Sequence, residues 1–211
     1  EMPAALDLRG FGRSPPGDDE PSLDLMADDL AGLLDRLDLD RVVLGGLSMG
    51  GYVSMAMLRR HPQRVRALLL MDTKASADLP GAAANRERIA TELEVSGSTG
   101  VLHSTIDGLL GETTRRHSPA TVGQVRAWID AVDPSAAAWA QRAMAARPDS
   151  RPTLASNHVP AAVIVGEEDT LTPHEDALAM AAALREGGTS AVVYIVPEAG
   201  HLSVVEQPER A

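Results

Sequence analysis

Apolar positions along the chain fall into short continuous runs separated by longer stretches with helical spacing. The clearest runs cover residues 41–44, 65–71, 161–165 and 191–196, and such runs are typical of strands buried in a sheet. A fifth run, Ala4–Leu8, predicts a further short strand. Strands that alternate with helices favour a parallel sheet with helices on both faces, so we predict an α/β fold with a doubly wound, mostly parallel sheet.

The stretches between these runs carry ordinary helix signals. Ser22 is a suitable N-cap, and apolar residues then recur every three or four positions to about Leu37. A second helix is expected after the 41–44 strand and should stop before Pro62. Thr172 is expected to cap a third helix, because a proline and then a glutamate follow it in the first turn.

The middle of the chain follows a different pattern. Residues 74–158 contain no clear strand, and their helical segments are broken repeatedly by glycine and proline. We therefore expect residues 1–73 and 159–211 to form the α/β core and residues 74–158 to form a helical insertion. Such folds bind ligands at the carboxyl edge of the sheet, so the insertion is predicted to cover that edge as a lid.

Composition excludes several classes of function. Hydrophobic residues at 44% and charged residues at 23% are typical of a globular protein, whereas aromatic residues make up only 2%. The net charge of −11 argues against nucleic acid or an anionic membrane as a partner, and no apolar run is long enough to span a membrane. We find no signal peptide, so a cytoplasmic location is expected. Cysteine is absent, which excludes disulfides and thiolate chemistry, and no two histidines have metal-ligand spacing.

The strongest chemical motif is Gly46-Leu47-Ser48-Met49-Gly50, which lies between a predicted strand and a predicted helix. A serine at such a sharp turn has a strained backbone that exposes its hydroxyl. The free N–H groups at the start of the helix point to the same place, where they can stabilise an anion. We expect Gly46 and Gly50 to be required because a Cβ at either position would collide there. The glycines do not form a phosphate loop, since no lysine follows them.

A serine hydroxyl needs a base, and the base needs an acid to orient it. His201 follows the 191–196 strand, and Asp169 follows the 161–165 strand, so both should lie at the same sheet edge as Ser48. Alternatives for the acid remain: Glu167, Glu168 and Asp72 compete with Asp169. Asp72 follows the 65–71 strand directly, and Glu168 is expected to face solvent.

These motifs resemble the α/β-hydrolase family, in particular its lid-bearing esterase and lactonase branch with 3-oxoadipate enol-lactonase-like proteins. The matching segments occur in the same order over nearly the whole chain: Asp7-Leu8-Arg9-Gly10-Phe11-Gly12-Arg13-Ser14, Gly46-Leu47-Ser48-Met49-Gly50-Gly51, Gly166-Glu167-Glu168-Asp169 with Thr172-Pro173, and Gly200-His201. The resemblance implies that Ser48 is the nucleophile, His201 the general base and Asp169 the orienting acid. It also implies that the Met49 N–H is one oxyanion donor and that no cofactor is needed.

The same resemblance indicates parts that this chain lacks. The family's fold begins with strands upstream of Asp7, and a His-Gly segment there supplies the second oxyanion donor. Loss of one donor typically costs about 10²- to 10³-fold in turnover. We therefore expect the chain to be truncated at both ends and the activity of this piece alone to be uncertain.

The predicted function is hydrolysis of a small carboxylic ester or lactone through an acyl-enzyme on Ser48. Two alternatives remain open. One is cofactor-free perhydrolysis by the same triad, as in haloperoxidase-like relatives. The other is a truncated, non-catalytic hydrolase fold that only binds ligands. The pattern does not identify the ester or lactone or the oligomeric state.

Overall fold

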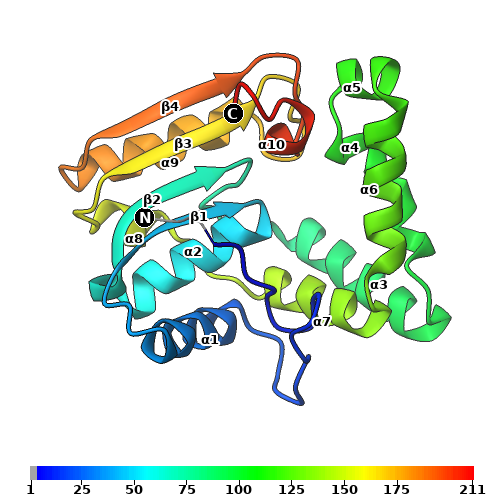
Figure 1. The fold of residues 1–211 in the computed structure, drawn as a ribbon, viewed down its shortest axis with the longest axis horizontal. Helices are drawn as coiled ribbons and strands as arrows, with labels where there is room; N and C mark the ends of the chain where they lie inside the picture. The colour runs from blue at the N-terminus through cyan, green and yellow to red at the C-terminus, as the bar shows by residue number, and fades with distance from the viewer. Residues whose placement is uncertain (1–3) are drawn as a thin grey trace.

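A computed structural model describes residues 4–211, which contain one four-stranded sheet with parallel pairing throughout (Figure 1). The strand order is β1-β2-β3-β4, so neighbours in the chain are neighbours in the sheet. The strands are β1 (Val42–Leu47), β2 (Val65–Met71), β3 (Ala161–Gly166) and β4 (Ala191–Val196). All four predicted core strands are confirmed. Because the strands are parallel, their carboxyl ends share one edge of the sheet. The arrowheads in Figure 1 point from this edge toward the helical region, the helices within residues 74–158.

Four helices pack against the sheet and against one another: α1 (Leu23–Arg36), α2 (Met49–Arg60), α8 (Arg151–Ala155) and α9 (His174–Glu186). The Ser22 side chain accepts a hydrogen bond from the Asp24 N–H, which confirms Ser22 as the N-cap of α1. The main core joins these helices to the sheet through residues such as Met57, Leu70 and Val163, all fully buried.

The two faces of the sheet differ in burial. Leu68, Leu70, Val163 and Val165 face the core and are buried, whereas alternate positions are half-buried or exposed. On β4, Val192 and Tyr194 are large exposed apolar residues. Within residues 4–211, the main core therefore lies against one face of the sheet, and the opposite face is partly exposed.

The predicted strand Ala4–Leu8 is wrong, because these residues form no strand. Their polar groups bond within a local loop instead. The Asp7 carbonyl accepts the hydroxyl of Ser14, and the Asp7 carboxylate accepts the N–H of Arg13. A ladder needs a neighbouring strand, and the free side of β1 has no strand beside it within the described residues.

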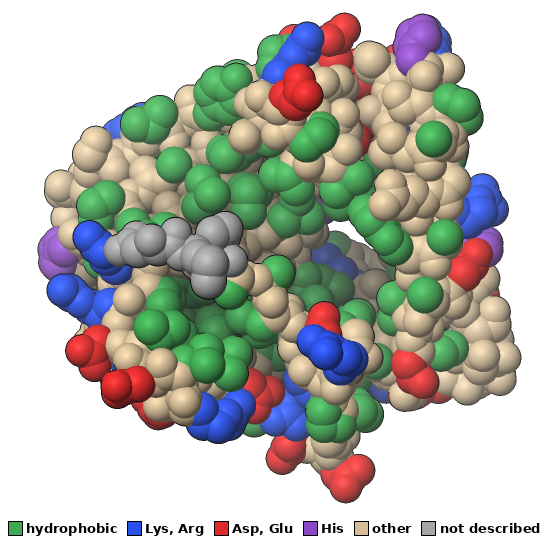
Figure 2. Space-filling model, viewed as in Figure 1, with side chains coloured by type: hydrophobic (Ala, Val, Ile, Leu, Met, Phe, Trp, Pro, Cys, Tyr) green, Lys and Arg blue, Asp and Glu red, His purple; other side chains and the backbone are tan. Residues whose placement is uncertain are grey.

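Residues 72–160 contain no strand, as the sequence predicts for most of this region. Besides α8, which packs in the core, the helices here are α3 (Pro80–Ser96), α4 (Ile106–Leu109), α5 (Glu112–His117), α6 (Pro119–Ala131) and α7 (Pro134–Ala145), with the 3-10 helix η2 (Gly100–Thr105). Two further short elements, η1 (Pro62–Arg64) and α10 (Ser203–Glu206), belong to the α/β part. In Figure 1 the α3 to α6 helices stand opposite the carboxyl edge of the sheet, and Figure 2 shows a hollow between the two parts.

Candidate functional site

Ser48 lies between the end of β1 and the start of α2, at the carboxyl edge of the sheet. Its φ of 51° and ψ of −113° place it in a region that L-residues rarely adopt. Two contacts hold this conformation: the Ser48 N–H donates to the Met71 carbonyl at 2.9 Å, and the Thr73 hydroxyl donates to the Ser48 carbonyl at 2.8 Å. The strained turn predicted from the sequence is therefore present, and the loop after β2 supports it.

Close packing between β1 and α2 explains part of the glycine pattern. A Cβ on Gly46 would lie 2.1 Å from the Gly50 carbonyl oxygen, and a Cβ on Gly51 would lie 2.6 Å from the Thr73 side chain. The expectation for Gly50 is wrong, because a Cβ there would meet no atom within 4 Å. The tight approach involves the backbone of Gly50 and not its side-chain position, so Gly51 is the second glycine that sterics require.

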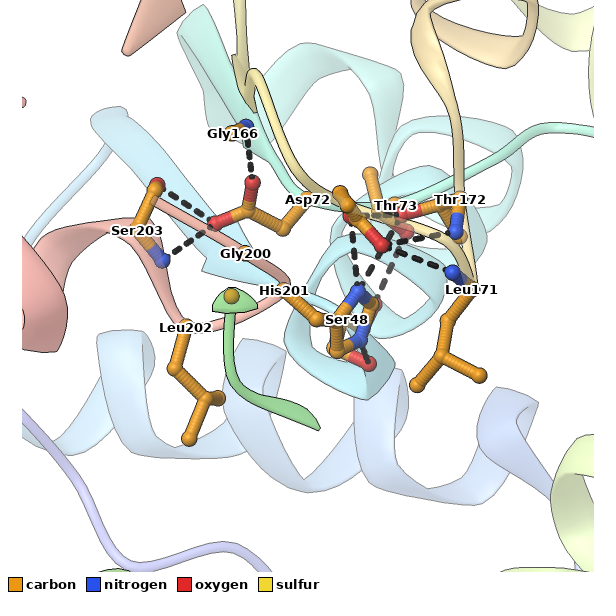
Figure 3. A network of polar contacts seen from close by, with 12 residues as sticks. Ser48, Asp72, Thr73, Gly166, Leu171, Thr172, Gly200, His201, Leu202 and Ser203 are labelled. Carbon is orange, nitrogen blue, oxygen red and sulfur yellow. Dashed lines mark hydrogen bonds and ion pairs between the residues drawn. The ribbon is translucent and has the colours of Figure 1, made fainter. Parts of the chain in front are cut away.

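His201 follows β4 and reaches Ser48 across the sheet edge (Figure 3). Its Nε2 lies 2.7 Å from the Ser48 Oγ, and its Nδ1 lies 2.9 Å from the Asp169 Oδ2. His201 and Asp169 are both buried, whereas Ser48 is half-buried. The structure thus brings the three predicted side chains into one row of hydrogen bonds, although they come from three different loops.

The Asp169 carboxylate is fully occupied by hydrogen bonds. Its Oδ1 accepts the N–H groups of Leu171 and Thr172, at 2.8 and 3.0 Å, and its Oδ2 also accepts the Thr172 hydroxyl at 2.7 Å. Burial raises the pKa of Asp169, but the hydrogen bond and charge of His201 together with the hydrogen bonds from Thr172 outweigh burial, and the pKa falls below its ordinary value. Asp169 therefore remains a carboxylate that can accept the His201 N–H.

Thr172 is not the helix N-cap that the sequence suggests. The helix α9 begins at His174 with Pro173 in the cap position, and the Thr172 hydroxyl bonds to Asp169 instead. That hydroxyl also lies 3.2 Å from His201 Nδ1. Thr172 therefore supports the contact between Asp169 and His201. Local capping rules do not predict this role. The spacing of an acid three residues before a threonine is a signal that could have indicated this contact.

Asp72 is fully buried at the end of β2, but its carboxylate points toward other partners (Figure 3). Its Oδ1 accepts the Gly166 N–H at 2.9 Å, and its Oδ2 accepts the N–H and hydroxyl of Ser203 at 3.1 and 2.6 Å. Burial raises the pKa of Asp72 to about 6, although these hydrogen bonds oppose the rise. Asp72 therefore ties together the loops after β2, β3 and β4, while Asp169 is the acid that contacts the imidazole.

The two neighbouring glutamates also have partners elsewhere. Glu167 is exposed and accepts the Glu198 N–H at 3.2 Å. The expectation that Glu168 faces solvent is wrong, because its carboxylate accepts the N–H of Thr113 at 2.9 Å and the Thr113 hydroxyl at 2.5 Å. Thr113 belongs to α5, so Glu168 links the helical region to the loop that carries Asp169.

Met49 is the first residue of α2, so its N–H is among those that a helix cannot bond internally. It directly follows Ser48, in the position predicted for an oxyanion donor. Residues 4–211 hold no group of three or more histidine, aspartate or glutamate side chains arranged to bind a metal ion. No helix in this same range has the length and apolar character needed to cross a membrane.

The model of the alpha/beta hydrolase fold family matches residues 4–208, which is nearly the whole chain. The chain belongs to the α/β-hydrolase fold family. This assignment confirms the fold class and the family resemblance predicted from the motifs.

Several relatives of this α/β hydrolase are esterases, lactonases or other hydrolases. The solved structure of a thermophilic esterase from Thermogutta terrifontis, with malate bound, is 41% identical and superposes with a TM-score of 0.89, covering 97% of this chain and 74% of that one. The 3-oxoadipate enol-lactonase 2 of Acinetobacter baylyi is 26% identical over 96% of this chain and 73% of the relative. The 2-hydroxymuconate semialdehyde hydrolase of Pseudomonas sp. (strain CF600) is 43% identical over 32% of this chain, a segment that spans only 24% of that relative's length.

Proposed function

We propose that this α/β hydrolase cleaves a small carboxylic ester or lactone, with Ser48 as nucleophile, His201 as general base and Asp169 as orienting acid. The observation that carries the proposal is the row of hydrogen bonds from Ser48 Oγ through His201 to Asp169, with distances of 2.7 and 2.9 Å. The esterase and enol-lactonase relatives support the substrate class. No second function is favoured by a specific observation.

The proposed reaction begins with attack of the Ser48 Oγ on the ester carbonyl carbon, while His201 Nε2 takes the hydroxyl proton. The carbonyl oxygen becomes an oxyanion that the Met49 N–H stabilises at the start of α2. Collapse breaks the carbon–oxygen bond, and the leaving alcohol takes the proton back from His201. Water then attacks the acyl-enzyme with His201 again as base, which releases the acid and restores Ser48.

Asp169 has two tasks in this scheme. Its carboxylate fixes His201 with Nδ1 protonated and Nε2 free to accept, and its charge stabilises the imidazolium that forms during both steps. The hydrogen bonds from Leu171 and Thr172 hold the carboxylate in place, so His201 has one preferred orientation. The low pKa of Asp169 fits this role, because a protonated acid would not accept the imidazole N–H.

We assign the helical region, residues 74–158 without the core helix α8, the role of a lid that selects the substrate. The support is its position opposite the carboxyl edge of the sheet and the hollow between the two parts (Figure 2). Leu171, which follows the acid loop, lies against this region, because a Cβ on Gly108 would be 3.3 Å from its side chain. Substrate therefore reaches Ser48 between surfaces from both parts.

Replacement of Ser48 by alanine tests the proposal directly. The Ser48→Ala variant of the complete protein should hydrolyse 4-nitrophenyl acetate at least about 10³-fold more slowly than the unchanged enzyme, because no other group can form the acyl-enzyme. Ser54→Ala is the matched control, since Ser54 lies in the same helix with its hydroxyl bonded to the Gly50 carbonyl. The control should stay within about twofold. Retention of activity in Ser48→Ala would refute the assignment.

A further inference from the structure

Glu206, the last residue of α10, bonds to the backbone on both sides of His201. Its Oε1 accepts the Gly200 N–H at 2.9 Å and the Leu202 N–H at 3.2 Å. Its Oε2 accepts the N–H of Gly111 at 2.8 Å. One half-buried carboxylate therefore binds the histidine loop with one oxygen and the helical region with the other.

The chain segments joined by Glu206 are in direct backbone contact. A Cβ on Gly200 would lie 2.2 Å from the Gly111 nitrogen, and a Cβ on Gly111 would lie 2.8 Å from the Gly200 nitrogen. A Cβ on Gly166 would lie 2.0 Å from the Gly200 carbonyl oxygen. Three glycines thus form a junction where the helical region, the Asp169 loop and the His201 loop meet. Side chains longer than hydrogen do not fit at any of the three positions.

Three backbone N–H groups in this junction would lose their acceptor without the Glu206 carboxylate. The N–H groups of Gly200 and Leu202 both point to Oε1, and the N–H of Gly111, a buried residue, points to Oε2. A buried N–H that loses its acceptor is costly, so the loop would rearrange to recover hydrogen bonds. Any such rearrangement moves His201, because it lies between Gly200 and Leu202.

We propose that Glu206 is a positioning residue that keeps the His201 imidazole aligned between Asp169 and Ser48, and that it does so through the docked helical region. The inference rests on the proposed function of the Ser48, His201 and Asp169 row. Glu206 acts through the backbone and does not contact the substrate in this scheme. Glu168 provides a parallel anchor to Thr113, so the helical region contacts the loops of both the acid and the base.

The test measures turnover per competent active site in the complete protein. Variants Glu206→Ala and Glu206→Gln are compared with Glu209→Gln, a control at an exposed glutamate three residues further along. Competent sites are counted by end-point labelling with a fluorophosphonate, and kcat and KM are then measured with 4-nitrophenyl acetate. A displacement of about 1 Å in a catalytic group can cost roughly 10²-fold in rate. We expect Glu206→Ala to lower kcat per labelled site by about 10- to 100-fold, with KM changed less than about threefold.

Glu206→Gln should give a smaller loss in kcat, because its one side-chain oxygen can still accept from one side of the junction while its amide nitrogen faces an N–H. The Glu209→Gln control should match the unchanged enzyme. An unchanged kcat per labelled site in Glu206→Ala would overturn the inference, as would a loss confined to the number of competent sites or to the melting temperature. If Glu206→Ala does not fold, the same criteria apply to Glu206→Gln.

Gly111→Ala tests the link to the helical region while leaving Glu206 in place. Its Cβ would lie 2.5 Å from the Glu168 Oε2 and 2.8 Å from the Gly200 nitrogen, so it disturbs both anchors of the helical region, and we expect kcat per labelled site to fall as in Glu206→Ala. An unchanged kcat in a folded Gly111→Ala variant would overturn the coupling. These outcomes are separate from failure of the proposed function. Retained activity in Ser48→Ala would refute the assignment of Ser48 as nucleophile and with it the proposed function. A normal kcat in the Glu206 variants, together with an inactive Ser48→Ala variant, would refute only the positioning role of Glu206.

Discussion

The carboxyl edge of the sheet and the helical region are held together in different ways. At the edge, the end of β1 packs against the start of α2 and the end of β3 packs against the His201 loop so closely that neither Gly46 nor Gly166 accepts a Cβ. Buried polar groups complete these contacts, with Asp72 joining Gly166 to Ser203. Every position in this network depends on its neighbours, so the geometry at Ser48 tolerates little change.

Within the helical region, side chains hold the α3 and α7 helices together. The α3 and α7 helices pack together, with Leu93 and Ala138 fully buried in a small cluster of their own. On the surface, Arg142 bonds to Glu87 and Glu94, all partly exposed. Exposed ion pairs of this kind contribute about 0 to 1 kcal/mol each. Sequence can therefore vary on the exposed surface of α3 and α7 at small cost, whereas Gly111, where the helical region meets the His201 loop, accepts no Cβ.

The largest expected effect is a loss of turnover at the sheet edge. Two buried aspartates lie there with different partners, and their variants should differ in kcat. Asp169→Asn presents an amide group to His201 Nδ1 and favours the wrong imidazole tautomer, so kcat with 4-nitrophenyl acetate should fall by about 10³- to 10⁴-fold, as in other Ser-His-Asp enzymes. Asp72→Asn should stay within about tenfold, because its contacts are with Gly166 and Ser203. A reversed order of the two losses would make Asp72 the orienting acid.

Sequence patterns predicted the site better than its supports. A glycine-flanked serine between strand and helix, and an acid and a histidine after later strands, were enough to predict that Ser48, Asp169 and His201 share one edge. This succeeds because parallel strands bring their carboxyl ends together whatever the separation in sequence. The supporting contacts of Glu206 and Glu168 depend on where the helical region docks, and local spacing carries no information about that.

The errors have the same origin. Thr172 has the signals of an N-cap, but tertiary structure places its hydroxyl on Asp169. Ala4–Leu8 has the composition of a strand, yet a strand also needs a partner, and sequence does not supply one. Gly50 belongs to the motif, but a Cβ at this position would extend into open space. A Cβ on Gly51 would instead collide with the Thr73 side chain. Local propensity therefore indicates a tendency, and contacts distant in sequence decide the outcome.

A smaller effect is expected when one methyl group is added in each region. Gly46→Ala places a Cβ 2.1 Å from the Gly50 carbonyl oxygen and should lower the free energy of unfolding by about 3 kcal/mol or more. Gly123→Ala, inside α6, meets no atom within 4 Å and should raise it by about 0.5 to 1 kcal/mol, as glycine is a poor helix former. Urea unfolding of both variants measures the difference. Equal losses would mean that the two regions are equally rigid.

A buried carboxylate at the edge and an exposed one in the helical region should also differ in how they affect stability. The pH dependence that each gives to the free energy of unfolding should have the opposite sign. Burial raises the pKa of Asp72 from 3.8 to about 6, so the folded protein binds this proton more tightly than the unfolded chain does. The stability from this protonation is fully present below pH 3.8 and is lost as the pH rises through about 6, with a total of about 3 kcal/mol at most. In Asp72→Asn, the free energy of unfolding should therefore fall less between pH 4.5 and 7.5 than in the unchanged protein.

Glu94 should behave in the opposite direction. The hydrogen bond from Arg142 holds its pKa below the ordinary value, so its contribution is present above the unfolded pKa and is lost as the pH falls through the folded pKa. Solvent exposure keeps that contribution small. Glu94→Gln should therefore slightly lower the unfolding free energy measured by urea above the unfolded pKa of Glu94, and the difference from the unchanged protein should vanish at the acid end of the range. If Asp72→Asn and Glu94→Gln changed the slope of stability against pH in the same direction, burial would not explain how the carboxylates of the two regions respond to pH.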